Sequence, residues 1–273
     1  MKDFSPVLIA AIRAARVGRA VLLKYLGQLE HVEHKFQAGL VSEADKESEK
    51  AIFDYLKLHF PGDIFLGEES AYANEKDRII PEKNQGRWIV DPLDGTTNYV
   101  HQFPVFCVSI GYEINGQTQV AVIDVPMMKQ VFTAVRGKGA WINGKPLRVS
   151  DTKSLSDAFV ATGFSNEIES RLEEQLRIFG KLVRELRAVR RAGAAAYDLC
   201  LVAQGVFDGY WEKGLQPWDS SAGMLIVEEA GGKVTTYKGQ PYDPFKLSIV
   251  AGNPKIVDLL VESMKSVINP DSD

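Results

Sequence analysis

Hydrophobic positions recur with helical spacing in the first sixty residues and with strand spacing in much of the remaining chain. Residues 1–26 are apolar but interrupted by arginines, a pattern that predicts an amphipathic first helix and does not fit a signal peptide. A second helix is expected to begin near Ser42, where Asp45 completes a capping-box-like pair. Pro61 and Gly62 are expected to end it.

Short apolar runs over 64–66 and 87–90 predict two buried strands, and Thr96 is expected to open a helical turn. Residues 106–135 alternate between apolar and polar and contain an Asn-Gly turn, which predicts an antiparallel meander. Beyond about residue 150, strands alternate with helices. We expect strands over 159–162, 186–189, 209–211 and 248–251, and helices over 168–183, 194–204, 220–230 and 256–268.

The pattern therefore predicts a mixed α/β (α+β) protein with two halves. An α+β half over 1–148 carries most of the candidate ligands, and an α/β half over 149–273 follows without a flexible linker.

Charge and composition narrow the class of protein. Net charge is −4 and the basic residues are scattered, so nucleic-acid binding is not indicated. Cys107 and Cys200 lie in apolar runs, which favours buried reduced thiols over a disulfide. No apolar stretch has membrane-spanning length, and we expect a cytoplasmic protein.

Acidic residues fall at the ends of predicted elements. Glu68 follows a strand, Asp91 and Asp94 bracket a Pro-Leu turn, and Asp219 stands at a helix start. An unpaired carboxylate is costly to bury, whereas several hard oxygens around one point suit Mg²⁺. Four histidines without ligand spacing argue against zinc.

The Asp-Pro-Leu-Asp-Gly-Thr run has a further use. Its proline fixes the backbone, so that the carboxylates of Asp91 and Asp94 and the carbonyl of Leu93 can converge on a metal. The amides of Gly95 and Thr96 can then hold phosphate oxygens. Taken singly, each of these residues is more often part of a turn, a helix cap or a solvated charge than a ligand.

Two longer runs resemble the signatures of the inositol monophosphatase family. Residues 88–101 read WIVDPLDGTTNYVH and are followed by Phe103-Pro104, and residues 217–223 read PWDSSAG and are followed by EAGG. Residues 67–70 and 40–45 resemble the family as well, so the likeness covers nearly the whole chain. It implies a layered αβαβα sandwich of the inositol monophosphatase and fructose-1,6-bisphosphatase type, a homodimer, and a lithium-sensitive phosphatase that needs Mg²⁺.

The resemblance also implies a set of metal ligands for two to three Mg²⁺ per active site. A first Mg²⁺ would be bound by Glu68, Asp91 and the Leu93 carbonyl. A second would be bound by Asp91, Asp94 and Asp219, and a weaker third by Glu68 and waters.

Catalytic and substrate-binding residues are implied by the same likeness. Thr96 would hydrogen-bond the attacking water, with Asp45 oriented towards its hydroxyl, and Glu68 would complete the catalytic set. Glu212 follows a predicted strand and could accept hydrogen bonds from hydroxyls, or could instead form a surface ion pair with Lys213. The full set of expected substrate contacts is Asp94, Gly95, Thr96, Gly193, Ala195, Glu212 and Asp219.

The expected activity is Mg²⁺-dependent hydrolysis of a small polyol phosphate by metal-activated water, with myo-inositol 1-phosphate favoured because residues 97–101 have the inositol-phosphatase form. Ala194 stands where the family usually has Ser or Thr, so one hydroxyl contact to the substrate is missing and the substrate stays open. Ser220 and Ser221 replace the commoner small apolar residues without changing a metal ligand. The alternatives are histidinol-phosphate, fructose-1,6-bisphosphate or nucleotide 3′-phosphatase activity, or a moonlighting regulatory or RNA-processing partner protein.

Overall fold

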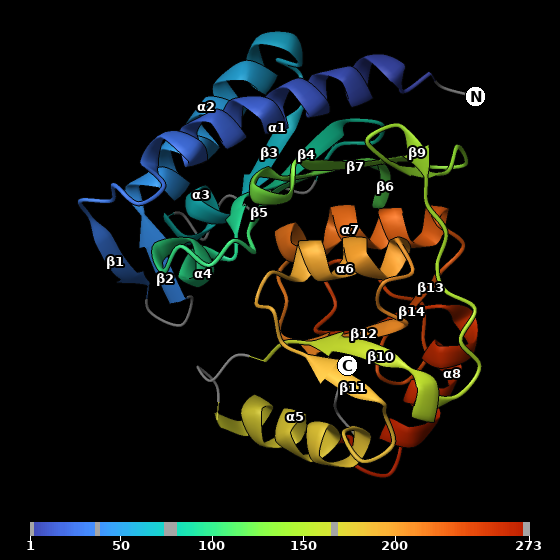
Figure 1. The fold of residues 1–273 in the computed structure, drawn as a ribbon. Helices are drawn as coiled ribbons and strands as arrows, with labels where there is room; N and C mark the ends of the chain where they lie inside the picture. Colours follow the sequence, from blue (N-terminus) through green and yellow to red (C-terminus); the bar gives the residue numbers. More distant parts are fainter. Residues whose placement is uncertain (1–2, 36–38, 74–80, 165–168, 270–273) are drawn as a thin grey trace.

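The computed structural model describes residues 3–35, 39–73, 81–164 and 169–269. Helices and sheets alternate in five layers, visible from top to bottom in Figure 1. The expected αβαβα sandwich is therefore confirmed. The layers are α1 (Ser5–Tyr25) with α2 (Glu43–His59), a seven-stranded sheet, α6 (Ala195–Ala203) with α7 (Pro217–Glu229), a five-stranded sheet, and α5 (Glu169–Leu182) with α8 (Pro254–Met264).

The seven-stranded sheet follows chain order and contains the expected meander. Its first two strands are parallel, and every later neighbour is antiparallel. Asn115 and Gly116 both have positive φ, which matches the right-handed twist of the hairpin they close. The strands are β3 (Ile64–Gly67), β4 (Gly86–Asp94), β5 (Cys107–Ile114), β6 (Gln117–Val125), β7 (Gln130–Val135), β8 (Ala140–Ile142) and β9 (Lys145–Pro146).

The five-stranded sheet has the order β11-β10-β12-β14-β13 and is mixed. β10 is parallel to both of its neighbours, and β14 is antiparallel to both of its own. The strands are β10 (Phe159–Thr162), β11 (Ala188–Arg190), β12 (Gly209–Lys213), β13 (Lys233–Thr235) and β14 (Ser248–Gly252). The strand expected at 186–189 begins two residues later, because the backbone N–H of Leu186 still bonds to Leu182 at the end of α5.

Several boundaries and short elements differ from expectation. α7 begins at Pro217, three residues early, because proline suits the first helical turn and Gln216 caps it. α8 ends at Met264 rather than near 268. Not expected were the hairpin of β1 (Val32–Lys35) and β2 (Gly39–Ser42), α3 (Glu68–Ala73), β8, β9, β13 and the 3₁₀ turns η2 (Pro126–Met128) and η3 (Leu155–Asp157). The expected helical turn after Gly95 is α4 (Thr96–Val100).

Three large hydrophobic clusters fill the spaces between the layers. Trp88 and Ile52 belong to the first, Leu199 and Leu225 to the central one, and Trp211 to the third. Helix α7 contacts strands of both sheets, so the central layer joins the two halves of the chain. The start of α7 thereby meets the end of β4. Among the described helices, none is both long and apolar enough to cross a membrane.

Candidate active site

A β-bulge in β4 places the two aspartates of the turn. Asp91 pairs with Ser109 and Asp94 with Cys107, so three steps along β4 match two steps along β5. In a regular strand, residues three apart point to opposite faces, whereas the extra residue of a bulge restores a common face. We expected a turn after Asp91. Instead, the strand continues through Asp94, and the Leu93 N–H donates to Asp91 Oδ1 at 2.9 Å.

Four carboxyl groups act on one another where β4, α3 and α7 meet. Burial, and then the negative charges of Glu68, Asp94 and Asp219, raise the pKa of Asp91 well above its usual range. Burial and the charges of Glu68 and Asp94 do the same to the pKa of Asp219. Burial raises the pKa of Asp94 to about 7 against an opposing hydrogen bond from Ala196 N–H. The site therefore concentrates negative charge that a bound cation would relieve.

Among the described residues, no group of three or more His, Cys, Asp or Glu side chains is arranged so that it could hold a metal ion by itself. Mg²⁺ keeps several waters and shares substrate phosphate oxygens, so a few converging carboxylates are enough for it. Buried oxygen donors with mutually raised pKa values fit such a hard divalent cation.

The backbone that follows Glu68 is held by a residue that we did not predict. Glu49, buried in α2, accepts the backbone N–H of Glu69 at 2.8 Å and of Ser70 at 2.9 Å. These are orphan donors at the start of α3, and a carboxylate there is favourable. A Cβ on Gly67 would collide with the Glu49 carboxylate, so a glycine is needed where the chain enters this turn.

Asp45 makes both of the contacts expected for it, one in the capping box and one to Thr96. Its Oδ2 accepts from the N–H and hydroxyl of Ser42 at 2.8 and 2.6 Å, which completes the capping box of α2. Its Oδ1 lies 2.9 Å from Thr96 Oγ1, which also lies 3.1 Å from the Leu93 carbonyl. Both neighbours of the hydroxyl are acceptors, so its proton is held on that side and its lone pairs stay available.

Two hydrogen bonds join the start of α6 to the end of β4 and to α4. The Ala196 N–H donates to Asp94 Oδ2 at 2.8 Å, and the Asn98 amide donates to the Ala192 carbonyl at 2.8 Å. Gly95 and Gly193 have φ of +93° and +84°, a region that favours glycine. A Cβ on Gly95 would also lie 2.9 Å from a backbone carbonyl oxygen.

Several of the expected residues line one cavity of about 190 Å³. Of those expected, Asp94, Gly193, Ala195, Glu212 and Asp219 line it. Its other lining residues are Thr162, Gly163, Arg191, Ala194, Asp198 and Leu215. Glu68 and Asp91 do not line it, although the charge of Glu68 acts on Asp94 in its wall. Asp45, Gly95 and Thr96 do not line it either, and Asp45 and Thr96 are hydrogen-bonded to each other.

The surface ion pair between Glu212 and Lys213 is not formed. Neighbouring residues of a strand point to opposite faces, and Lys213 Nζ pairs with the buried Glu174 Oε2 at 2.6 Å. Glu212 is instead bonded by the Tyr210 hydroxyl, and a Cβ on Gly163 would strike its carboxylate. Burial raises the pKa of Glu212 to about 7.

Asp198 was also missed. It lies in α6 within an apolar run, where a single acidic residue was a signal that we could have used. Burial, and then the charges of Asp94 and Glu212, raise its pKa well above the usual range.

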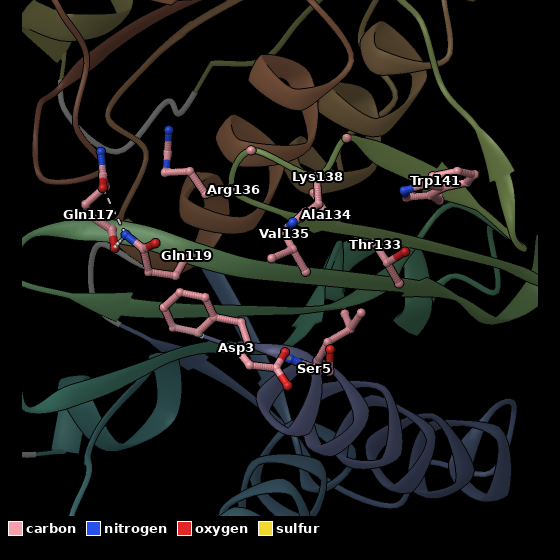
Figure 2. A pocket seen from close by; sticks show the side chains of 14 residues that line it. Asp3, Ser5, Gln117, Gln119, Thr133, Ala134, Val135, Arg136, Lys138 and Trp141 are labelled. Atoms are coloured by element: carbon pink, nitrogen blue, oxygen red, sulfur yellow. Dashed lines mark hydrogen bonds between the residues drawn. The ribbon is translucent and has the colours of Figure 1, made fainter. Parts of the chain in front are cut away.

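A larger cavity of about 640 Å³ lies elsewhere, between the start of α1 and the strands β6 to β8. Figure 2 shows Asp3 and Ser5 facing Gln119, Val135 and Thr133 across it. None of the candidate carboxylates of the active site lines this cavity.

Fold and site together define a layered α/β sandwich with an acidic, oxygen-rich cavity beside the bulged β4. The chain belongs to the inositol monophosphatase family, whose model matches residues 3–269. It is 40% identical over 263 residues to an inositol monophosphatase of Mesembryanthemum crystallinum, covering 96% of each chain. It is 39% identical over 266 residues to the Nus factor SuhB of Salmonella typhimurium, covering 97% of each.

A solved structure agrees with the fold. The extragenic suppressor protein suhB of Bartonella henselae superposes with a TM-score of 0.88 at 40% identity, covering 97% of this chain and 100% of that one. Family membership supports phosphatase activity on a small phosphate ester.

Proposed function

We propose that this chain hydrolyses the phosphate monoester of a small polyol with the help of Mg²⁺, and that myo-inositol 1-phosphate is its favoured substrate. The observation that carries the proposal is the set of mutually destabilised carboxyl groups, Asp91, Asp94 and Asp219, next to a cavity that also holds Glu212. The clustered carboxylates suit cations, which in turn bind phosphate, and the carboxyl group of Glu212 suits hydroxyls.

The proposed ligands for Mg²⁺ are Glu68, Asp91, the Leu93 carbonyl, Asp94 and Asp219. When bound, Mg²⁺ supplies positive charge against the phosphate and lowers the pKa of water. The remaining work of a phosphoryl transfer is mostly positioning, so no serine or cysteine nucleophile is required.

Thr96 is proposed to orient the attacking water. Its proton is held by Asp45 and the Leu93 carbonyl, so its hydroxyl oxygen is left to accept a hydrogen bond from that water. The backbone at Gly95, Gly193 and Ala195 is proposed to contact the substrate, with Ala194 contributing no hydroxyl.

A substrate panel tests the proposal. Purified protein is assayed on myo-inositol 1-phosphate, histidinol phosphate, fructose 1,6-bisphosphate, 3′-phosphoadenosine 5′-phosphate and p-nitrophenyl phosphate, with Mg²⁺ and after chelation. We expect the highest kcat/KM on inositol 1-phosphate, lost on chelation and restored by Mg²⁺. Turnover that survives chelation would refute the metal requirement, and a clear preference for another ester would correct the substrate.

A second role is suggested by the relatives. The Salmonella protein is named a Nus factor, so we also propose that this chain acts as a regulatory partner protein. Net charge is −4, which favours a protein partner over direct binding of nucleic acid. The role is separable from catalysis, because an inactive Asp91→Asn protein should keep any partner that binds outside the cavity.

Mg²⁺ should stabilise the protein more at pH 8 than at pH 6. A carboxyl whose folded-state pKa is raised stabilises the fold most at low pH, and this contribution is lost as pH rises through the folded pKa, about 7 for Asp94. Mg²⁺ needs the deprotonated groups, so it offsets the repulsion that appears at high pH. Calorimetric melting at both pH values, with KCl at equal ionic strength as the control, measures this. An equal Mg²⁺ effect at the two pH values would contradict the assignment.

Lithium should inhibit turnover. Li⁺ is close to Mg²⁺ in size but has half its charge, so it can occupy a Mg²⁺ position among the carboxylates without supplying the same neutralisation. Steady-state rates are measured in LiCl and in NaCl at equal ionic strength. Equal rates in the two salts would count against the expected lithium sensitivity.

A further inference from the structure

Asp198 is an unpartnered acid in the wall of the proposed active-site cavity. It is 2% exposed, it lines the cavity, and its Oδ1 is buried without a hydrogen-bond partner among the described residues. An unsatisfied buried carboxyl group is unfavourable, so such a group in a cavity wall indicates a missing partner.

The other acids of the same cavity have protein partners. Asp94 accepts the N–H of Ala196, and Asp219 accepts the N–H of Gln216 at 2.7 Å. Glu212 is bonded by the hydroxyl of Tyr210. Asp198 therefore differs from these neighbours, because its Oδ1 remains available to hydrogen-bond a ligand.

Its neighbours indicate which part of the ligand it meets. The charges that act on Asp198 are those of Asp94 and Glu212, which line the same cavity. Among the described residues that line the cavity, Arg191 is the single basic one, and its charge acts on Glu212. The walls between them are small, since they include Gly163 and Ala195. This part of the cavity suits a hydroxylated group more than a second anion.

We propose that Asp198 is a specificity-determining residue that hydrogen-bonds a hydroxyl of the alcohol portion of the substrate, beside the hydroxyl contact of Glu212. The proposal rests on the polyol phosphatase activity proposed above and deepens it. A polyol with hydroxyls on adjacent carbons can reach two neighbouring carboxyl groups at once, whereas an alcohol with no further hydroxyl reaches neither. Asp198 thereby contributes to the choice of leaving group and has no part in the metal site.

The test compares Asp198→Ala and Asp198→Asn with wild type on inositol 1-phosphate and on p-nitrophenyl phosphate, with Mg²⁺. Asp198→Ala should lower kcat/KM about fivefold on the inositol ester, the loss expected for one hydrogen bond, and less than about twofold on the nitrophenyl ester. Asp198→Asn keeps a hydrogen-bonding side chain of the same shape, and we expect it to retain most of the selectivity. The ratio of the two activities is taken within one protein, so a partly unfolded preparation does not mimic the effect.

Asp124→Ala is the matched control. Asp124 is a buried carboxyl group in β6, paired with Arg19 at 3.3 Å and absent from the cavity. The ratio of activity on the inositol ester to activity on the nitrophenyl ester should be the same for Asp124→Ala as for wild type. In the Asp198 variants, the Mg²⁺ concentration that gives half-maximal rate should equal that of wild type.

An Asp198→Ala protein that loses equal activity on both esters, or none on the inositol ester, would overturn the role of Asp198 while leaving the phosphatase assignment intact. A raised Mg²⁺ requirement would overturn it too, since Asp198 would then support the metal site. A wild-type protein inactive on both esters would instead refute the proposed function, and the role of Asp198 with it.

Discussion

Replacing Asp91 with asparagine is expected to lower turnover of inositol 1-phosphate by on the order of a thousandfold or more, with the protein still folded. Asp91 is buried, and its Oδ1 accepts the Leu93 N–H. An asparagine keeps that acceptor and its shape but removes one negative charge that is proposed to serve two Mg²⁺ positions. Both positions would weaken, and with them the neutralisation of the phosphate.

The same variant should melt no lower than wild type in the absence of metal. Glu68, Asp94 and Asp219 raise the pKa of Asp91, so an uncharged isostere relieves repulsion in the metal-free protein. Rates over a Mg²⁺ titration and metal-free melting curves measure the two effects.

Asp208→Asn is the control for this variant, because Asp208 is buried and accepts a backbone N–H, that of Phe159 at 2.7 Å, in the other sheet. It should turn over substrate at close to the wild-type rate. Near-normal turnover of Asp91→Asn at saturating Mg²⁺ would remove Asp91 from the metal site.

The sequence predicted which residues meet at the site better than how they meet. Asp91 and Asp94 were expected to converge through a proline turn, yet they share a face because β4 bulges against β5. A bulge is defined by pairing with a strand elsewhere in the chain, so a local pattern does not reveal it. Asp45 and Thr96 are 51 residues apart, and their contact was suggested by the family likeness, whereas the capping box of α2 was visible locally.

Long elements with a clear period were predicted well, and short ones were not. The amphipathic α1 and the meander of β5 to β7 agree with the pattern. The β1–β2 hairpin was missed because its strands have only four residues each and little apolar alternation. The order of the five layers came from resemblance, because the packing of α6 and α7 between two sheets depends on contacts across the whole chain.

The same contrast between local and distant contacts applies to Glu212. Local sequence allowed a surface ion pair with Lys213, but the strand directs the two side chains to opposite faces and Lys213 is taken by Glu174. Glu212 lies instead in the cavity wall, bonded by Tyr210 and given room by Gly163. Its carboxyl group is therefore positioned to meet the alcohol portion of a substrate.

Glu212→Ala should accordingly reduce kcat/KM for inositol 1-phosphate roughly tenfold or more, the loss expected when a hydrogen bond to a charged group, about 1.5–3 kcal/mol, is removed. A site that hydrogen-bonds a substrate hydroxyl discriminates strongly against substrates without that hydroxyl, because the polar groups of the site are then left unpaired. A substrate without further hydroxyls, p-nitrophenyl phosphate, should scarcely be affected. The effect should exceed that of Asp198→Ala, since the Tyr210 hydroxyl holds Glu212 in place before the substrate arrives.

Glu212→Gln and Tyr210→Phe refine the measurement. The glutamine keeps two hydrogen-bonding atoms without the charge, so it should fall between wild type and Glu212→Ala on the inositol ester. Tyr210→Phe removes only the hydroxyl that bonds Glu212, and it should weaken selectivity for the inositol ester in the same direction by a smaller factor. Equal losses on both esters would mean that Glu212 supports the fold or the metal ligands, because Asp94 and Glu212 act on each other through their charges. Full activity of Glu212→Ala on both esters would mean that the polyol is recognised elsewhere in the cavity.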